Sequence, residues 1–336
     1  MHSTMKPSFI LILLLVLTAS CSQPVYVRHQ GMALGTTYSL IYEAPGDQDY
    51  ADEIRYLLDS LENCLSIYRP QSLISRFNSN DTTARSDEWF RSVFETSRRI
   101  SEASQGALDI TVAPLVNYWG FGSKGDSLPN PDVRVIDSLL RYVGMEKVWL
   151  EGGRLMKADT GVVLDMNAVA KGFASDVVAD FLIRKGCRNL LVEIGGEIHA
   201  QGVNPTGVPW KVGIDRPQEG LAPGEQLQVR IALSNRSLAT SGNYRKYHEL
   251  GGVKYAHTID PSTGYPTRHR LLSATILAAT CMEADAWATA CMAMGPQKSK
   301  ALLETHPELD GCLITGNDEG GMDVYYTPGF KSLILK

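Results

Sequence analysis

The 336-residue sequence lacks most of the short motifs that identify an enzyme class directly. It contains no Walker A loop, no GxSxG elbow and no HExxH pair, which argues against a P-loop NTPase, an α/β-hydrolase and a zincin. It also lacks a basic field, because its formal net charge is −5, so no nonspecific binding of nucleic acid is expected. The function has to be sought in less common groupings of polar residues.

Long hydrophobic stretches are scarce as well, and the longest unbroken apolar run, residues 9–17, has nine residues. As a helix it would rise about 14 Å, against a bilayer core of about 30 Å, so it is too short to span a membrane. Lys6 precedes the run and Thr18-Ala19-Ser20-Cys21 follows it, which is typical of a signal peptide. Residues 1–20 are therefore predicted to be a leader that exports the protein.

The leader resembles a bacterial lipoprotein signal, in which Cys21 would be acylated, with palmitate among its chains, and would become the mature N-terminus. Thr18 departs from the aliphatic residue that is usual at that position. The alternative is an ordinary cleaved signal followed by an incidental cysteine. The resemblance implies a lipid anchor in a bacterial membrane, expected to be the inner membrane, with the body in the periplasm.

Cysteine is sparse beyond Cys21, and no CxxC pair occurs. An odd number of widely separated thiols indicates neither a disulfide framework nor a zinc site, although one disulfide stays open. Most of these thiols have apolar neighbours in the sequence and are interpreted as small core residues. They are Cys64, Cys187, Cys281, Cys291 and Cys312.

The composition, 44% hydrophobic and 21% charged, is that of a globular protein. Periodicity predicts helices over residues 49–65, 88–103, 168–185 and 282–294. It predicts two strands within residues 25–42, around a turn at 31–35, and a surface loop over 120–131. The remaining strands are predicted at 147–150, 154–157, 162–164, 190–194, 197–201, 210–214, 226–233, 237–239, 272–279, 311–315 and 322–326.

Strands that follow one another in hairpins and are mixed with helices indicate an α+β fold with antiparallel or mixed sheets. The last two predicted strands, 311–315 and 322–326, are expected to form a closing hairpin. No linker or repeat divides the chain. We therefore expect residues 21–336 to form one catalytic unit with two lobes.

The strongest local signal is the segment ADAWAT at residues 284–289. Asp285 and Thr289 are four residues apart and share one face of a helix. A carboxylate and a hydroxyl are hard oxygen ligands that suit Mg²⁺ or Ca²⁺. The competing interpretation is that Asp285, near Glu283, is a first-turn acid favoured by the helix dipole.

A second signal is the segment DMNAVAKG at residues 165–172. Asp165, together with Asn167, can cap the helix that follows, and a helix start presents free N–H groups to an anion. Lys171 adds a positive charge one turn further on. The alternative is a capped helix with a solvated lysine.

Two further candidate site residues lie in strands and turns. Glu193 stands in an apolar strand before Gly195-Gly196, where an unpaired carboxylate would be costly, so it needs a partner in the protein or on a ligand. His257 opens the turn-rich segment HTIDPSTGYP at residues 257–266 and could exchange a proton near neutral pH. A lone histidine is nevertheless more often structural.

Taken in order, these segments resemble the ApbE family of FAD:protein FMN transferases over nearly the whole mature chain. The resemblance rests on GMALGT at 31–36, SIYRP at 66–70, GALDIT at 106–111, DMNAVAKG at 165–172, VEIGGEI at 192–198, TSGNY at 240–244, HTIDPSTGYP at 257–266 and ADAWAT at 284–289. It implies that FMN is transferred from FAD to a Thr or Ser hydroxyl of a target protein, with release of AMP. The implied targets are subunits of membrane redox pumps of the sodium-translocating NADH:quinone reductase or Rnf type.

The resemblance also implies roles for individual residues. Mg²⁺ would be held by Asp285, Thr289 and the backbone carbonyl of Ala168, and His257 would be the catalytic base. The residues implied to bind FAD are Met32, Tyr68, Ala107, Leu108, Asp109, Asp165, Lys171, Glu193 and the backbone near Ile259. The alternatives are a Mg²⁺-dependent FAD pyrophosphatase, in which water replaces the target hydroxyl, and a non-catalytic periplasmic flavin-binding lipoprotein.

Overall fold

The structure, a computed structural model, describes residues 25–122, 131–218, 220–222, 224–244, 247–250 and 253–336. The predicted leader, with Lys6 and Cys21, lies outside these residues, as does most of the predicted loop at 120–131. The assignment of residues 1–20 as a leader and 21–336 as one unit therefore stays a prediction. Among the helices of the described ranges, none combines the length and the apolar character that crossing a membrane requires.

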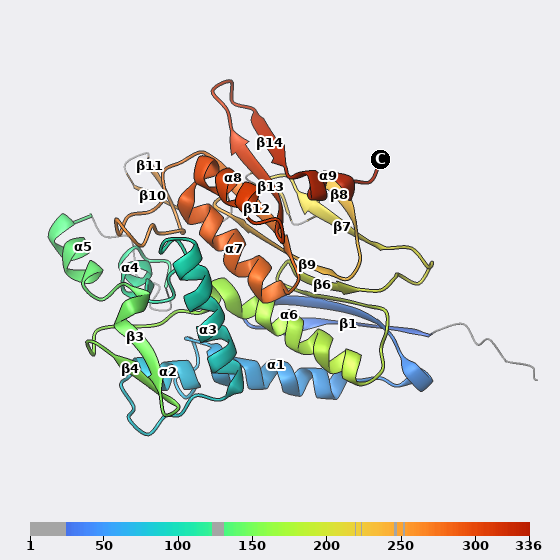
Figure 1. Ribbon diagram of the computed structural model, residues 1–336, viewed down its shortest axis with the longest axis horizontal. Helices are drawn as coiled ribbons and strands as arrows, with labels where there is room; N and C mark the ends of the chain where they lie inside the picture. The colour runs from blue at the N-terminus through green and yellow to red at the C-terminus, as the bar shows by residue number, and fades with distance from the viewer. Residues whose placement is uncertain (1–24, 123–130, 219, 223, 245–246, 251–252) are drawn as a thin grey trace, which may run out of the picture.

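A single large sheet organises the molecule, with the strand order β1-β2-β5-β6-β9-β12-β13-β14 and antiparallel pairing at every step (Figure 1). This confirms the predicted α+β class. The strands of this sheet are β1 (Tyr26–Ala33), β2 (Thr36–Glu43), β5 (Leu190–Ile194), β6 (Glu197–Gln201), β9 (Arg236–Gly242), β12 (Leu271–Ala278), β13 (Asp310–Gly316) and β14 (Met322–Tyr326).

Three smaller hairpins complete the strands, and they are β3 (Val148–Glu151) with β4 (Arg154–Lys157), β7 (Trp210–Asp215) with β8 (Leu227–Leu233), and β10 (Tyr247–Leu250) with β11 (Val253–Ala256). The predicted closing hairpin is confirmed as β13 and β14. The predicted strand at 162–164 is wrong, because no ladder forms there. Instead, the side chain of Asn78 bonds both backbone groups of Leu164, accepting from N at 2.8 Å and donating to O at 2.9 Å.

The four predicted helices are present, within two residues at each end, and several shorter ones join them. The helices are α1 (Ala51–Leu65), α2 (Leu73–Asn78), α3 (Glu88–Ala103), α4 (Ala113–Tyr118), α5 (Val133–Leu140), α6 (Asn167–Arg184), α7 (Cys281–Met294), α8 (Pro296–Thr305) and α9 (Pro328–Ser332). The five helices α2, α4, α5, α8 and α9 were not predicted, although Pro296 occupies the first position of α8, where proline is favoured.

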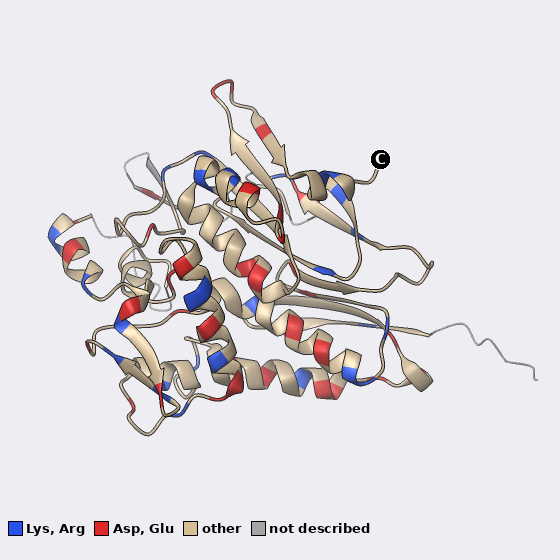
Figure 2. Ribbon diagram, viewed as in Figure 1, with Lys and Arg blue, Asp and Glu red and all other residues tan. Residues whose placement is uncertain are grey.

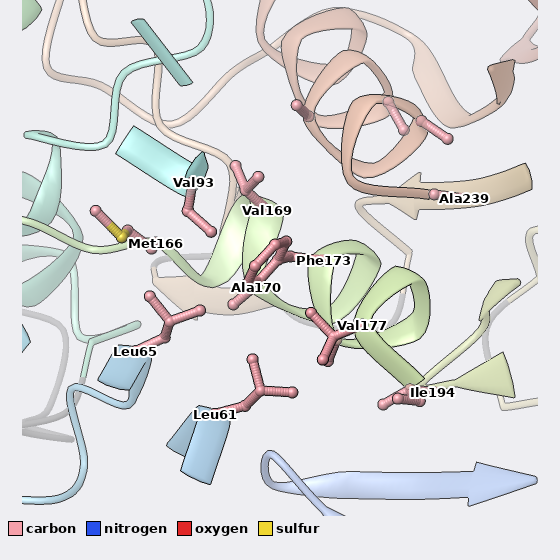
Figure 3. Packing of buried hydrophobic residues seen from close by; sticks show 14 of the residues in the cluster. Leu61, Leu65, Val93, Met166, Val169, Ala170, Phe173, Val177, Ile194 and Ala239 are labelled. Carbon is pink, nitrogen blue, oxygen red and sulfur yellow. The ribbon is translucent and has the colours of Figure 1, made fainter. Parts of the chain in front are cut away.

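The two faces of the large sheet are covered differently. Val192 and Ile194 of β5 belong to the core beneath α6 and α7, which lie side by side across one face (Figure 1). On the other face, Trp210 and Ile231 of the β7–β8 hairpin and Phe330 of α9 form a separate core. Buried side chains also surround α6 closely, since Val169, Phe173 and Val177 pack among α1, α3 and the sheet (Figure 3).

All five described cysteines are buried and free, which confirms their interpretation as small core residues. The disulfide that the sequence left open is therefore not formed among them. Burial raises the pKa of Cys291 and of Cys312 to about 12. These thiols are consequently unreactive as nucleophiles at neutral pH.

Asp176 of α6 fixes the start of α7. Its Oδ1 accepts from the Cys281 amide at 2.9 Å and its Oδ2 from the Met282 amide at 2.8 Å, while His199 Nδ1 lies 2.8 Å from Oδ1. Thr280 caps the same helix start by accepting from the Glu283 amide. The first N–H groups of α7, which no carbonyl within the helix can reach, are thus bonded by a carboxylate from its neighbour.

Replacing Asp176 by alanine is therefore expected to lower the free energy of unfolding by about 2–4 kcal/mol, because two helix amides would lose a charged acceptor. Urea denaturation followed by circular dichroism measures this change. Asp132 caps the exposed start of α5 through the Arg134 amide, so Asp132→Ala is the matched control and should cost about 1 kcal/mol or less. A cost for Asp176→Ala no larger than that of the control would contradict this account.

Candidate functional site

The start of α6 is held by Asp165, whose Oδ1 accepts from the Asn167 amide at 2.8 Å. The predicted cap is therefore wrong in its position: the N-cap residue of α6 is Met166, which makes no side-chain capping bond, and Asp165 bonds the amide of Asn167, the first residue of the helix. The Asp165 amide in turn donates to the Ile110 carbonyl at 2.7 Å, which ties the segment at 106–111 to the helix start. Burial raises the pKa of Asp165, and the Asn167 groups and the Lys171 ammonium oppose that shift.

Lys171 lies between two buried carboxyl groups rather than in solvent. Its Nζ is 3.2 Å from Oε1 of Glu197 and 3.8 Å from Oδ2 of Asp285. Burial alone would lower the pKa of Lys171, but the Asp285 and Glu197 carboxylates outweigh it and raise that pKa above its usual value. Burial raises the pKa of both acids, and the ammonium opposes the shift. The interpretation of Lys171 as a solvated lysine is wrong.

Asp285 is deeply buried, with 2% of its surface exposed. Because α7 begins at Cys281, the acid in its first turn is Glu283 and not Asp285, so the helix-dipole interpretation of Asp285 fails. Its Oδ2 accepts from the Gly172 amide of α6 at 3.0 Å. In a regular α-helix that amide donates to the carbonyl of Ala168, so the Asp285 carboxylate reaches the turn that carries this carbonyl.

Thr289 lies one turn beyond Asp285 on α7, and its Oγ1 is 3.3 Å from Oγ of Ser241 at the end of β9. The three predicted ligands Asp285, Thr289 and Ala168 are thus contributed by two crossing helices. All three would present hard oxygens, the donors that Mg²⁺ prefers. Over the described ranges no three His, Cys, Asp or Glu side chains form a metal-binding group, and the predicted set accordingly contains one carboxylate.

Met32 and Tyr68 are two of the few large apolar side chains that the described surface exposes, at 71% and 63%. Glu62 of α1 links their segments, because it accepts from the Leu34 amide at 2.6 Å and forms an ion pair with Arg69. The pKa of Tyr68 is raised by burial and by the Asp165 carboxylate, and the Asn167 side chain opposes the shift. Exposed apolar side chains of this kind suit the face of a planar ligand.

The segment Ala107, Leu108 and Asp109 reaches the same helix start, but its side chains differ in what they can contact. Leu108 is 2% exposed and belongs to the core, so only its backbone is available to a ligand. Asp109 accepts through Oδ1 from the amide and the hydroxyl of Thr111, at 2.7 and 2.6 Å. Burial raises the pKa of Asp109, and these two bonds oppose the shift.

His257 follows β11, in a segment that is tied to the end of β9. Thr258 donates to Oδ1 of Asn243 at 2.7 Å, and Asn243 is two residues beyond Ser241, the neighbour of Thr289. The His257 ring lies 6.3 Å from that of Phe121 between centroids. Ile259 is 5% exposed and packs in a third core cluster, so its backbone is what a ligand could contact, as the sequence analysis expected.

Glu193 does not join the Lys171 group. The two-residue turn Gly195-Gly196 pairs Glu193 with Ile198 and Ile194 with Glu197. Since Ile194 belongs to the core under α6, Glu197 lies on that face and Glu193 on the opposite one. The partner that Glu193 requires is the Gly196 amide, which donates to its Oε1 at 3.0 Å.

Glu197 is the site residue that the sequence analysis missed. It is 4% exposed, and its Oε2 is buried without a hydrogen-bond partner among the described residues. The pairing across the glycine turn was the signal that could have identified it, because cross-strand partners share a face.

A cavity of about 620 Å³ lies against the 106–109 segment, but of the predicted site residues only Asp109 lines it. Acidic and basic residues are interspersed along α1, α3 and α6 in the view of Figure 2. Positive potential for an anionic ligand therefore has to come from local groups such as Lys171 and the start of α6.

The fold and this site together define a class, and the chain belongs to the ApbE family, whose model matches residues 34–313. It is 38% identical over 334 residues to the FAD:protein FMN transferase of Vibrio cholerae serotype O1, covering 96% of this chain and 97% of that protein. It is 31% identical over 315 residues to the FAD:protein FMN transferase of Escherichia coli K12, covering 91% and 88%.

Solved structures show the same likeness. The flavin transferase ApbE from Vibrio cholerae superposes with a TM-score of 0.83 at 35% identity, over 92% of this chain and 99% of that one. The apo form of the flavinyl transferase ApbE from Pseudomonas stutzeri gives 0.82 at 32% identity, over 93% and 98%. These comparisons confirm the family and the fold that the sequence motifs predicted.

Proposed function

We propose that the chain is an FAD:protein FMN transferase that transfers FMN from FAD to a Thr or Ser hydroxyl of a target protein, depends on Mg²⁺ and releases AMP. The observation that carries the proposal is the contact between α6 and α7, where the Asp285 carboxylate accepts from the Gly172 amide and lies 3.8 Å from the Lys171 ammonium, with Thr289 one turn further along α7. Its family relatives, named FAD:protein FMN transferases, support the same reaction.

The residues of the site fit the needs of phosphoryl transfer, which depends mainly on positioning and on neutralising charge. When bound, Mg²⁺ would neutralise the diphosphate and stabilise the departing AMP. Lys171 and the positive end of the α6 dipole add positive potential for the same diphosphate. Met32 and Tyr68 would contact the flavin from the exposed side.

His257 would accept the proton of the attacking hydroxyl, directly or through one water. The hydroxyl oxygen forms a bond to the phosphorus of the FMN moiety, and the bond between that phosphorus and the bridging oxygen breaks. The electron pair leaves with AMP. The same residues would serve hydrolysis if water took the place of the hydroxyl, so the pyrophosphatase is the second candidate.

One incubation separates these candidates: purified protein with FAD, Mg²⁺ and a fragment of the target subunit. Flavin that stays on the target through denaturing electrophoresis supports the transferase. Free FMN and AMP without a labelled target would favour the hydrolase, and unchanged FAD would favour a flavin-binding protein without chemistry.

The lipid anchor at Cys21 and the periplasmic position beside redox-pump subunits are part of this proposal. Both rest on the leader sequence and on the resemblance. Metabolic labelling with a fatty-acid analogue, compared between the parent and Cys21→Ser, tests the anchor. Label in the parent that is absent from the variant is the expected result, and label in neither would remove this part of the proposal.

Replacing His257 by glycine is expected to slow flavin transfer by about 100-fold or more, because a positioned general base contributes about 10²–10⁴-fold. Transfer to the target fragment is measured by flavin fluorescence in denaturing gels. Added imidazole should restore part of the rate, since it can occupy the space left by the ring. A glycine variant that transfers flavin as fast as the parent would remove His257 from the mechanism.

A further inference from the structure

The buried carboxyl group of Glu197 has no role in the reaction described so far, yet it occupies a costly position. Within the part of the chain that the structure describes, its Oε2 has no hydrogen-bond partner, and an unpaired buried carboxylate oxygen is destabilising. Gly195, at a φ of +68°, lies close to this carboxyl group, since a Cβ there would be 2.8 Å from Cγ2 of Thr36, 3.1 Å from Cδ of Lys171 and 3.2 Å from Oε2 of Glu197. The glycine turn thus fits closely over the Lys171–Glu197 pair.

Lys171 interacts more closely with Glu197 than with Asp285. Nζ lies within hydrogen-bond range of Glu197 at 3.2 Å, but at 3.8 Å from Asp285 it makes a longer ion pair. One ammonium can neutralise only one carboxylate fully. Its closer partner is Glu197, so the charge of Asp285 is less compensated than it would be if Lys171 had no other acid beside it.

We propose that Glu197 is a positioning residue, which holds the Lys171 ammonium away from Asp285 and so keeps that carboxylate available for a divalent cation. The inference rests on the cation site of the proposed function. Without the charge of Glu197, Asp285 remains within ion-pair distance of Lys171, and the ammonium would compete with the cation for the carboxylate. Substituting a residue that orients a metal ligand in this way typically weakens metal binding by about 10–100-fold.

The test is a titration of the FAD-free protein with Mn²⁺, a spectroscopically visible substitute for Mg²⁺, followed by electron paramagnetic resonance. Glu197→Gln, which keeps the shape and removes the charge, should weaken Mn²⁺ binding by about tenfold or more. Glu304→Gln is the matched control, because Glu304 forms an exposed pair with Lys300 at 4.0 Å, and it should bind as the parent does.

A second substitution shows whether Glu197 acts through the lysine. The double variant Glu197→Gln/Lys171→Met should recover most of the lost affinity, since no ammonium then competes for Asp285. Lys171→Met alone should bind Mn²⁺ at least as tightly as the parent, and this comparison holds even if Glu197→Gln folds poorly. Parent-like binding by a folded Glu197→Gln, or no recovery in the double variant, would overturn the positioning role.

Asp285→Asn separates this inference from the proposed function. If it abolishes Mn²⁺ binding while Glu197→Gln leaves binding unchanged, the positioning role alone is overturned. If Asp285→Asn binds Mn²⁺ like the parent, the cation site itself is wrong, and the inference falls with it. Thermal unfolding of each variant, measured without Mn²⁺, establishes that the proteins compared are folded.

Discussion

Replacing Asp285 by asparagine should lower the rate of Mg²⁺-dependent flavin transfer by at least about 100-fold, which corresponds to about 2.7 kcal/mol of transition-state stabilisation. Asparagine has nearly the shape of aspartate and can still accept from the Gly172 amide, which bonds Oδ2 in the parent. What it lacks is the negative charge that a divalent cation requires. The rate is measured in metal-buffered assays with the target fragment, across a series of Mg²⁺ concentrations.

Thr289→Ser is the matched control for this experiment, because it keeps the hydroxyl on the same turn of α7 and should retain most of the activity. The asparagine variant should also unfold at a temperature close to that of the parent. If Asp285→Asn kept both the parent rate and the parent dependence on Mg²⁺, the assignment of the α6–α7 crossing as the cation site would be wrong.

The substitution Gly172→Ala, which adds one methyl group between α6 and α7, should lower both the stability and the transfer rate strongly. A Cβ at position 172 would lie 2.3 Å from the Cys281 carbonyl oxygen and 2.8 Å from Cβ of Asp285. The first of these atoms is backbone, so no side-chain rotation relieves the clash, and α6 and α7 must separate. Overpacking of this kind costs about 3 kcal/mol, and displacing a ligand by about 1 Å can cost about 100-fold in rate.

Urea denaturation gives the stability change, and the transfer assay gives the rate of the variant at a temperature where it is still folded. Gly316→Ala is the control, because the atoms nearest to a Cβ at position 316 are 3.9 Å away, and it should change stability by about 0.5 kcal/mol or less. A Gly172→Ala protein with the parent's stability and rate would show that the two helices do not approach each other as described.

Local patterns were sufficient to predict the elements that carry the site, but not the contacts between them. The strands at Leu190–Ile194 and Glu197–Gln201 and the helix at Glu88–Ala103 were predicted at their observed bounds, because each has a clear periodicity or turn at its ends. Residues 162–164 failed because an Asn78 side chain, distant in sequence, replaces the ladder bonds of a strand.

In the site too, features within one helix could be predicted from the sequence, whereas contacts between elements could not. Asp285 and Thr289 could be paired from their spacing on one helix. That Asp285 bonds the Gly172 amide could not be predicted from periodicity, because it depends on how α6 and α7 cross. Glu193 and Glu197 can be told apart only by the strand pairing across Gly195-Gly196. That pairing places Glu197 opposite Ile194, on the face under α6, and leaves Glu193 on the other face.

The carboxylate of Asp176 has a consequence beyond the stability of α7. It bonds the amides of Cys281 and Met282 and thereby fixes how far α7 slides along α6. Asp285 is one turn further along α7, so the separation between its carboxylate and the Ala168 carbonyl is set before any ligand arrives. A cation entering such a preorganised site does not have to order two independent helices, and the entropy that this ordering would cost at binding is instead lost when the chain folds.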